Sequence, residues 1–270
     1  MDSHRLEVGR AADAVIKLFG GLSRLAQARG HAHVTIVQGG WDRGAIPLKH
    51  HARVLDAPKS LGIRLHRNDL LDELHLANVS DEDAARAQCY TLLAHLLHAP
   101  PTQALLDVVR GLAGDRSELG QALSALASVA QQITPEAAER EYSALFIGLA
   151  RGELLPYASY YLTGFLQEKP LADLRGDMAR LGIGRREGVA EPEDHIASLC
   201  EMMAGLITGA FGEPASLAEQ QKFFTRHLAS WAPRFFEDLQ AAKAAVLYMP
   251  VGRIGRLFMT IEAEAFGMAE

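Results

Sequence analysis

The sequence has few cysteines and lacks the short motifs on which common enzyme classes depend. Its 270 residues include two cysteines, Cys89 and Cys200, which lie far apart in helix-like sequence. Neither a disulfide framework nor a cysteine-based metal site is therefore expected. The sequence also contains no phosphate-binding GxxxxGK(S/T), no GxGxxG after a strand, no HExxH and no CxxC. These absences argue against an enzyme, and no cofactor is expected.

Long apolar runs are also absent. No stretch reaches the roughly 18 uninterrupted apolar residues that a membrane span requires. The N-terminus, MDSHRLEVGRAADAVIKLFGG, carries acidic residues and lacks a small-residue cleavage site. We therefore expect neither membrane insertion nor secretion, and we predict a cytoplasmic protein.

The net charge of −6 is unevenly distributed. Residues 1–78 contain 11 basic and 8 acidic residues, whereas residues 79–270 contain 16 basic and 25 acidic ones. Nucleic-acid backbones require a basic surface, so this acidic second part disfavours nucleic-acid binding. It suits a positively charged partner, provided that the acids cluster on one face.

The first 78 residues differ in composition from the rest and are predicted to form an N-terminal extension of uncertain structure. They hold 7 of the 11 histidines, and Gly and Pro interrupt their short helical and β-like runs. Four of the histidines, His31, His33, His50 and His51, would suit a metal site or a weakly structured extension in which they are incidental. A translation start near Val79 is a further alternative.

From Asp81 onward, apolar residues repeat at steps of three and four, and period-2 alternation is absent. The predicted fold is all-α, a single helical bundle of about nine or ten helices over residues 79–270. Helix starts are indicated by Ser80, Ser117 and Thr134, each followed by acidic residues or proline, and by Thr102, which follows Pro100-Pro101. The later helices are predicted at 170–182, 192–211, 214–230, 232–248 and 252–267.

The first notable constellation joins a helical segment to an aromatic cluster. Glu141 and Leu145 fall on one expected helical face with Gly148, and three tyrosines follow within the segment 157–161. Tyrosines supply a large contact surface with a polar tip, but aromatic stripes are more often part of a core. Both interpretations, helix packing and partner contact, stay open.

The second constellation is Glu191-Pro192-Glu193-Asp194-His195-Ile196. Proline at a first helical position followed by acids is typical of a helix start, which predicts a helix beginning at Pro192. The helix dipole there would favour a neutral His195. This imidazole could close the turn, bind a partner or a nucleotide, or pair with Asp194 or Glu191 as an acid–base couple. No nucleophile lies at a fixed offset, so a hydrolytic triad is not indicated.

The third constellation is an aromatic string near the C-terminus that begins at Phe223-Phe224 and runs through Trp231 and Phe235-Phe236 to Phe258 and Glu262. Its steps of three and four residues describe one apolar helix face. Packing is the preferred interpretation.

In this order and spacing, the constellations resemble the TorD/DmsD/NarJ family of redox-enzyme maturation chaperones over residues 80–270. The matching residues are Glu141, Leu145, Phe146, Pro156, Tyr157, Ser159, Tyr161, Glu191, Pro192, Asp194, His195, Ile196, Glu201 and Met203. Departures occur at Ala158, where the family pattern has Glu, at Tyr160 for Val, at Leu199 for an acid, and at Met202 for Phe.

The resemblance implies a chaperone and not an enzyme. Such a protein would bind the twin-arginine signal peptide, the apo body, or both, of a molybdopterin-guanine-dinucleotide oxidoreductase of the formate dehydrogenase or TMAO/DMSO reductase type. It would assist cofactor insertion and prevent premature export. The alternatives are a NarJ-like scaffold for a non-exported partner and a nucleotide-binding or hydrolysing enzyme that uses His195 and Asp194.

The resemblance also implies which residues bind the peptide and which other partners to expect. The predicted peptide-binding residues are Glu141, Leu145, Phe146, Tyr157, Ser159, Tyr161, Glu191, Pro192, Asp194, His195, Glu201 and Met203. Weak GTP binding is the one cofactor that the resemblance suggests. The expected assembly is a monomer or a helix-swapped dimer, with the loop 182–191 as the hinge.

Overall fold

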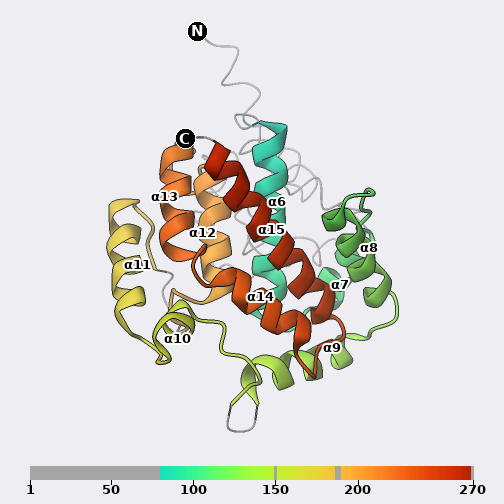
Figure 1. Ribbon diagram of the computed structural model, residues 1–270. Coiled ribbons are helices and arrows are strands. Elements are labelled where there is room, and N and C mark those ends of the chain that lie inside the picture. The colour runs from blue at the N-terminus through green and yellow to red at the C-terminus, as the bar shows by residue number, and fades with distance from the viewer. Residues whose placement is uncertain (1–79, 149–150, 186–189, 269–270) are drawn as a thin grey trace, which may run out of the picture. The chain divides into compact units, whose positions relative to one another are not determined.

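The computed structural model describes residues 80–148, 151–185 and 190–268, which form an all-helical unit (Figure 1). The predicted N-terminal extension, with its four notable histidines, lies outside the described residues, as do residues 186–189 of the predicted hinge loop. The described residues form ten α-helices and one π-helical turn, and they contain no strand. The prediction of an all-α bundle is confirmed.

Most helices follow one another with short connections, whereas longer segments precede α10 and α12. Their bounds are α6 Asp81–His98, α7 Gln103–Arg110, α8 Glu118–Ala130, α9 Pro135–Tyr142, the π-turn η3 Ser143–Ile147, α10 Ala158–Thr163, α11 Lys169–Arg180, α12 Ile196–Thr208, α13 Leu217–His227, α14 Ala232–Ala241 and α15 Tyr248–Met268. Among the described residues, none of these helices is both long and apolar enough to cross a membrane.

Polar side chains begin several of the helices. The side-chain oxygens of Thr102, Ser117 and Thr134 accept hydrogen bonds from backbone N–H groups in the first turns of α7, α8 and α9. Such a cap satisfies a donor that the helix itself leaves free, and it contributes about 1 kcal/mol. The predicted starts of these three helices are therefore confirmed, and side-chain capping explains them.

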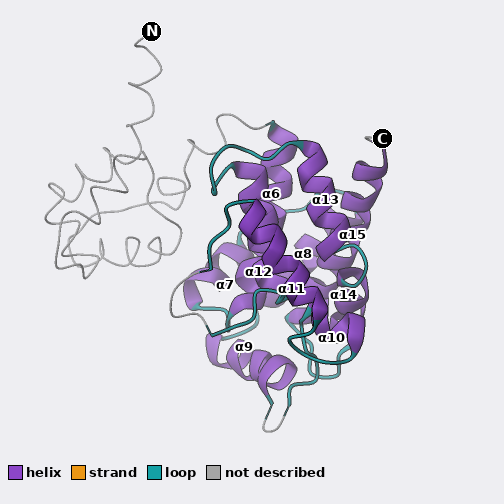
Figure 2. Ribbon diagram, turned by 90° about the vertical axis from the view of Figure 1, so that its left-hand side faces the viewer, coloured by secondary structure: helices purple, strands orange, loops and turns teal. Residues whose placement is uncertain are grey.

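The centre of the unit is α12, which packs along α6 (Figures 1 and 2). Its apolar residues point in all directions, and ten of its residues are buried. A helix that is apolar all round must be surrounded by protein, which explains the central position of α12. It can therefore serve as the support on which neighbouring elements are placed.

A helical hairpin of α14 and α15 crosses the front of the unit in Figure 1. The single helix predicted over 232–248 is wrong in extent, because α14 ends at Ala241 and α15 begins at Tyr248. Close approach of the two helices requires glycine: a Cβ atom on Gly255 would lie 2.1 Å from the Phe236 ring. The aromatic string is buried in this hairpin and in α13, so the packing interpretation is confirmed.

A buried ion pair joins the first described helix to the last. The Arg86 guanidinium donates to both carboxylate oxygens of Glu262 at 2.7 and 2.9 Å, and the Tyr90 hydroxyl donates to the same carboxylate at 2.9 Å. Bidentate geometry is the strong form of such a pair. The pair fixes the position of α6 against α15.

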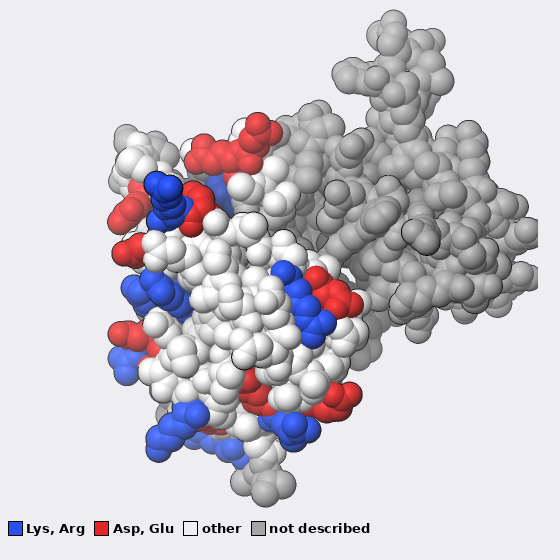
Figure 3. Space-filling view, turned by 90° about the vertical axis from the view of Figure 1, so that its right-hand side faces the viewer, with Lys and Arg blue, Asp and Glu red and all other residues white. Residues whose placement is uncertain are grey.

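The face over α8 carries few charges at its centre (Figure 3). Helix α8 has one charged residue, Glu118, and its outer residues include Gln121, Ala125 and Ser128. Acidic and basic side chains are interspersed around the margin of this face. The acidic excess of the sequence therefore does not gather on the face that Figure 3 shows.

Candidate functional site

Two sequence motifs that lie 35 residues apart meet in one structure. The segment before α10 and the segment before α12 form an antiparallel bridge between Tyr157 and His195. Next to it, the backbone N–H of Ala158 donates to the carbonyl of Asp194 at 3.0 Å. The second half of the first constellation and the whole of the second are therefore parts of one site.

Side chains reinforce this bridge. The Tyr157 hydroxyl donates to the Glu191 carboxylate. The backbone N–H and the hydroxyl of Ser159 both donate to Asp194 Oδ2, at 2.8 and 2.5 Å. Burial raises the pKa of Tyr157, and its hydrogen bond to Glu191 raises it further, so the phenol stays a donor. Asp194 thus holds the start of α10 against the start of α12.

His195 is the N-cap of α12. Its Nδ1 accepts a hydrogen bond from the backbone N–H of Ala197 at 3.1 Å, which requires the neutral tautomer protonated on Nε2. Burial, followed by the positive charge of His98, lowers the pKa of His195 from 6.5 to about 3. The expected neutral imidazole is confirmed, as is the interpretation that it closes the turn. The predicted helix start at Pro192 is wrong, because α12 begins at Ile196.

Glu141 anchors the N-terminus of α15. Its buried carboxylate accepts hydrogen bonds from three consecutive backbone N–H groups, those of Val246, Leu247 and Tyr248, at 2.7, 3.0 and 2.8 Å. A carboxylate at a helix N-terminus satisfies free donors and interacts favourably with the helix dipole. The regular helix expected from Glu141 to Gly148 is interrupted by the π-turn that begins at Ser143.

Tyr161 connects the site to the C-terminal hairpin. Its hydroxyl donates to Asp238 Oδ2 on α14 at 3.0 Å. Its ring lies 5.4 Å from that of Trp231 and 5.9 Å from that of Phe235. The aromatic cluster and the aromatic string, which the sequence separates by about 70 residues, are therefore in contact through this tyrosine.

The twelve predicted peptide-binding residues fall into two classes of burial. The buried ones are Glu141, Leu145, Ser159, Asp194, His195 and Met203. The partly or fully exposed ones are Phe146, Tyr157, Tyr161, Glu191, Pro192 and Glu201. The twelve do not form one patch, because Glu141 bonds to the backbone at the start of α15 whereas Asp194 and His195 lie at the start of α12.

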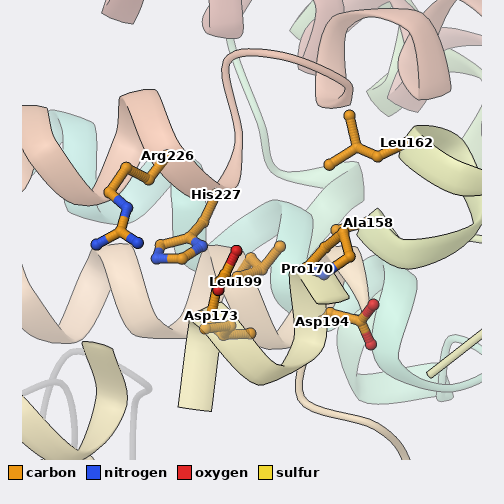
Figure 4. A pocket seen from close by; sticks show the side chains of 9 residues that line it. Ala158, Leu162, Pro170, Asp173, Asp194, Leu199, Arg226 and His227 are labelled. Carbon is orange, nitrogen blue, oxygen red and sulfur yellow. The ribbon is translucent and has the colours of Figure 1, made fainter. Parts of the chain in front are cut away.

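A pocket of about 150 Å³ opens beside the paired motifs (Figure 4). Its walls come from α10, α11, α12, α13 and the segment before α12. The lining residues are Ala158, Leu162, Pro170, Asp173, Leu174, Asp194, Leu199, Arg226 and His227. Of the twelve predicted residues, Asp194 lines this pocket.

Asp194 leaves one carboxylate oxygen unsatisfied. The residue is 1% exposed, and its buried Oδ1 has no hydrogen-bond partner in the described part of the chain. Leaving a buried charged acceptor without a donor costs about 1–3 kcal/mol or more. Because Asp194 also lines the pocket, a ligand that enters there could supply the donor that this oxygen lacks.

On the wall opposite Asp194, the positive charge of Arg226 is already paired with a carboxylate. Arg226 Nη1 lies 2.6 Å from Asp177 Oδ2, and His227 Nε2 lies 2.8 Å from the same oxygen. Burial lowers the pKa of His227, although the bond to Asp177 opposes this shift. Asp173 Oδ2 is likewise paired, with Lys169 Nζ at 2.5 Å, so the negative charge open to a cationic ligand comes from Asp194.

The volume limits what the pocket can hold. Sites for drug-sized ligands and cofactors usually measure about 300–1,000 Å³. A pocket of about 150 Å³ lies below this range and is of a size for one long side chain. The geometry therefore suits a single cationic side chain that donates hydrogen bonds.

Most of the pocket was not predicted as a site. Asp173, Arg226 and His227 come from α11 and α13, which approach each other only in the folded chain, so their spacing in the sequence carries no signal. Two other lining residues, Ala158 and Leu199, could be noticed in the sequence. They are the positions where the resemblance to the family pattern lacks an acid. These departures give the pocket apolar walls beside Asp194.

Comparisons with known proteins agree on one family. The family model described as "Nitrate reductase delta subunit" matches residues 112–237. Chaperone protein TorD from Vibrio atlanticus (strain LGP32) is 31% identical over 172 residues, which cover 56% of this chain and 80% of that protein. Chaperone protein TorD from Vibrio cholerae (strain Classical Ogawa 395) is 28% identical over 196 residues, covering 70% and 85%.

One solved structure is also similar. The crystal structure of a candidate redox enzyme maturation protein from Archaeoglobus fulgidus superposes with a TM-score of 0.47 and 22% sequence identity. The superposition covers 65% of this chain and 93% of that one.

Proposed function

We propose that this chain, which belongs to the TorD/NarJ family of redox-enzyme maturation chaperones, binds the twin-arginine signal peptide of a molybdopterin-guanine-dinucleotide oxidoreductase. Its curated relatives are named as chaperones and not as catalysts, so the chain is a chaperone and not an enzyme. In this proposal it acts in the cytoplasm, where it holds a formate dehydrogenase or TMAO/DMSO reductase type of client until the cofactor is inserted. Export is delayed until then.

The observation that carries this proposal is the unsatisfied Oδ1 of Asp194 at a pocket the size of one side chain. An arginine guanidinium presents five N–H donors and cannot lose its charge in a protein. Placed in this pocket, it would supply the donor that Asp194 lacks. One arginine of the signal peptide would occupy the pocket, and the other would remain at its rim.

Seven of the predicted residues besides Asp194 then divide into contact and support roles. The half-buried Tyr157 adjoins the pocket residue Ala158 in the chain, and the exposed Glu191 and half-buried Pro192 shortly precede Asp194. These three are proposed to form the rim that meets the second arginine. Ser159 and His195 hold Asp194 and the start of α12 in place. Glu141 holds the start of α15, and Leu145 is fully buried in the core.

The test is a pull-down of the tagged protein from cells that express molybdoenzymes, with identification of the bound proteins by mass spectrometry. We expect one molybdoenzyme precursor with a twin-arginine signal peptide to be enriched, and to be lost when its signal peptide is deleted. Retention of the client without its signal peptide would replace the proposal with a scaffold that binds a mature surface. If no molybdoenzyme binds, the proposal is wrong.

A further inference from the structure

A short apolar strap, residues 162–168, joins α10 to α11 beside the pocket. Three of its side chains are exposed although they are large and apolar: Leu162 by 45%, Phe165 by 70% and Leu166 by 46%. Single exposed apolar side chains are ordinary on protein surfaces. Three within five residues form a patch, and such patches mark interaction surfaces.

Local hydrogen bonds hold the strap in this exposed conformation. The Thr163 hydroxyl donates to the carbonyl of Ser159 at 2.8 Å and accepts from the backbone N–H of Phe165 at 3.2 Å. Gly164 ends α10 with a φ of 84°, and Gln167 adopts a φ of 59°, which is uncommon for a residue other than glycine. The hydrogen-bonded turn therefore directs the Phe165 side chain toward solvent.

The strap is continuous with the pocket. Leu162 belongs to both, because it lines the pocket and begins the strap. Pro170 and Asp173, which follow the strap in α11, line the pocket as well. Helix α10, which precedes the strap, is held by Asp194, whose Oδ2 accepts both hydrogen bonds from Ser159. A ligand that fills the pocket therefore contacts Leu162, at the start of the strap.

We infer that the strap binds the apolar residues that neighbour the arginine pair in the client peptide, so that the site recognises a cation next to large apolar side chains. This inference rests on the proposed function. The charge of the pocket and the apolar character of the strap define the occupant together: Asp194 selects the cation, and Leu162, Phe165 and Leu166 cover the adjoining apolar run. The departures at Ala158 and Leu199 extend the apolar surface into the pocket itself.

The test measures binding of a synthetic signal peptide to the full-length protein by fluorescence anisotropy. The variants are Phe165→Ser and Leu166→Ser in the strap, Ile261→Ser as a matched control on α15 with 44% exposure, and Asp194→Asn. We expect each strap variant to weaken binding by about tenfold, a typical effect of removing an interface anchor. The control should bind like the wild type.

A second peptide, whose apolar run is replaced by serine, separates the strap from the pocket. We expect it to bind wild type and strap variants equally weakly and still to lose affinity on Asp194→Asn. Unchanged binding in the strap variants, with loss in Asp194→Asn, would refute the strap while leaving the proposed function intact. Unchanged binding in all variants would refute both.

Two further outcomes would also overturn the inference. If sedimentation shows that Phe165→Ser turns a dimer into a monomer while peptide affinity is unchanged, the strap is a contact between copies of the chain. If vesicles of anionic lipid bind the wild type and not Phe165→Ser, with peptide affinity unchanged, the strap is a membrane contact.

Discussion

Replacing Glu141 by alanine is expected to destabilise the fold without weakening peptide binding. The carboxylate satisfies three backbone N–H groups at the start of α15, and the donors of Leu247 and Tyr248 are buried. A buried donor left without an acceptor costs about 1–3 kcal/mol, and the lost charge at a helix N-terminus adds about 0.3–1 kcal/mol. With two buried donors, the expected decrease in the free energy of unfolding is therefore about 2–7 kcal/mol.

Glu141→Gln is the matched comparison. Glutamine can place its oxygen where Oε1 accepts from Val246 and Tyr248, but its amide group then faces the N–H of Leu247. We expect a decrease of about 1–3 kcal/mol for this variant. Both are measured by urea unfolding, and the peptide affinity of the folded protein is measured at low denaturant. A variant Glu141→Ala that unfolds like the wild type but fails to bind peptide would refute this reasoning and make Glu141 a contact residue.

The remaining predictions concern packing, a buried charge and pH. Gly255→Ala should lower the free energy of unfolding by about 1–3 kcal/mol, because its methyl group would overlap the Phe236 ring; thermal melts check this, and an unchanged melting temperature would contradict it. Arg86→Met should lower the free energy of unfolding by about 3–5 kcal/mol, since the Glu262 carboxylate would stay buried without its partner. Urea unfolding should show that the double variant with Glu262→Gln recovers part of this loss. The depressed pKa of His195 implies stability that is present above pH 6.5 and is lost as the pH falls toward about 3, because the unfolded chain binds the proton first. Replacing His195 by Asn should retain the cap and flatten that part of the stability–pH curve, and an unchanged curve would assign the dependence to other groups.

Much of the fold follows from local sequence. Ser117 and Thr134 predict helix starts because the capping interaction spans only three residues, and the structure contains these caps. The apolar repeat predicts helices for the same reason, since it reports which face each helix buries. The packing interpretation of Phe236 also holds, because its neighbours along α14 share its face.

The failed predictions involve interactions between distant segments. Pro192 carries a plausible local signal for a helix start, yet the bridge between Tyr157 and His195 holds the preceding residues in an extended turn and delays α12 to Ile196. The break after Ala241 reflects the contact of Glu141 with the start of α15, which is more than 100 residues away. Such contacts have no periodicity that could be detected in the sequence.

In the candidate site, too, the local motifs could be predicted from the sequence and the contacts between distant segments could not. The motif residues Tyr157, Ser159, Asp194 and His195 could be identified from the sequence, and the structure brings them together. Their separate tasks could not be identified, because burial decides which of them meets a ligand. The pocket and the strap depend on the approach of α10, α11 and α13, and this follows from tertiary packing.

In the proposed function, Asp194 receives an arginine of the client signal peptide. The most direct measurement is a double-mutant cycle between Asp194→Asn and a peptide whose two arginines are replaced by glutamine, with Asp107→Asn on α7 as a control. The asparagine side chain in the Asp194→Asn variant would retain an acceptor for Ser159, so the fold should be preserved. We predict that each single change weakens binding about tenfold or more and that the double change adds little. Additive losses, or an unchanged affinity of Asp194→Asn for the native peptide, would contradict the account.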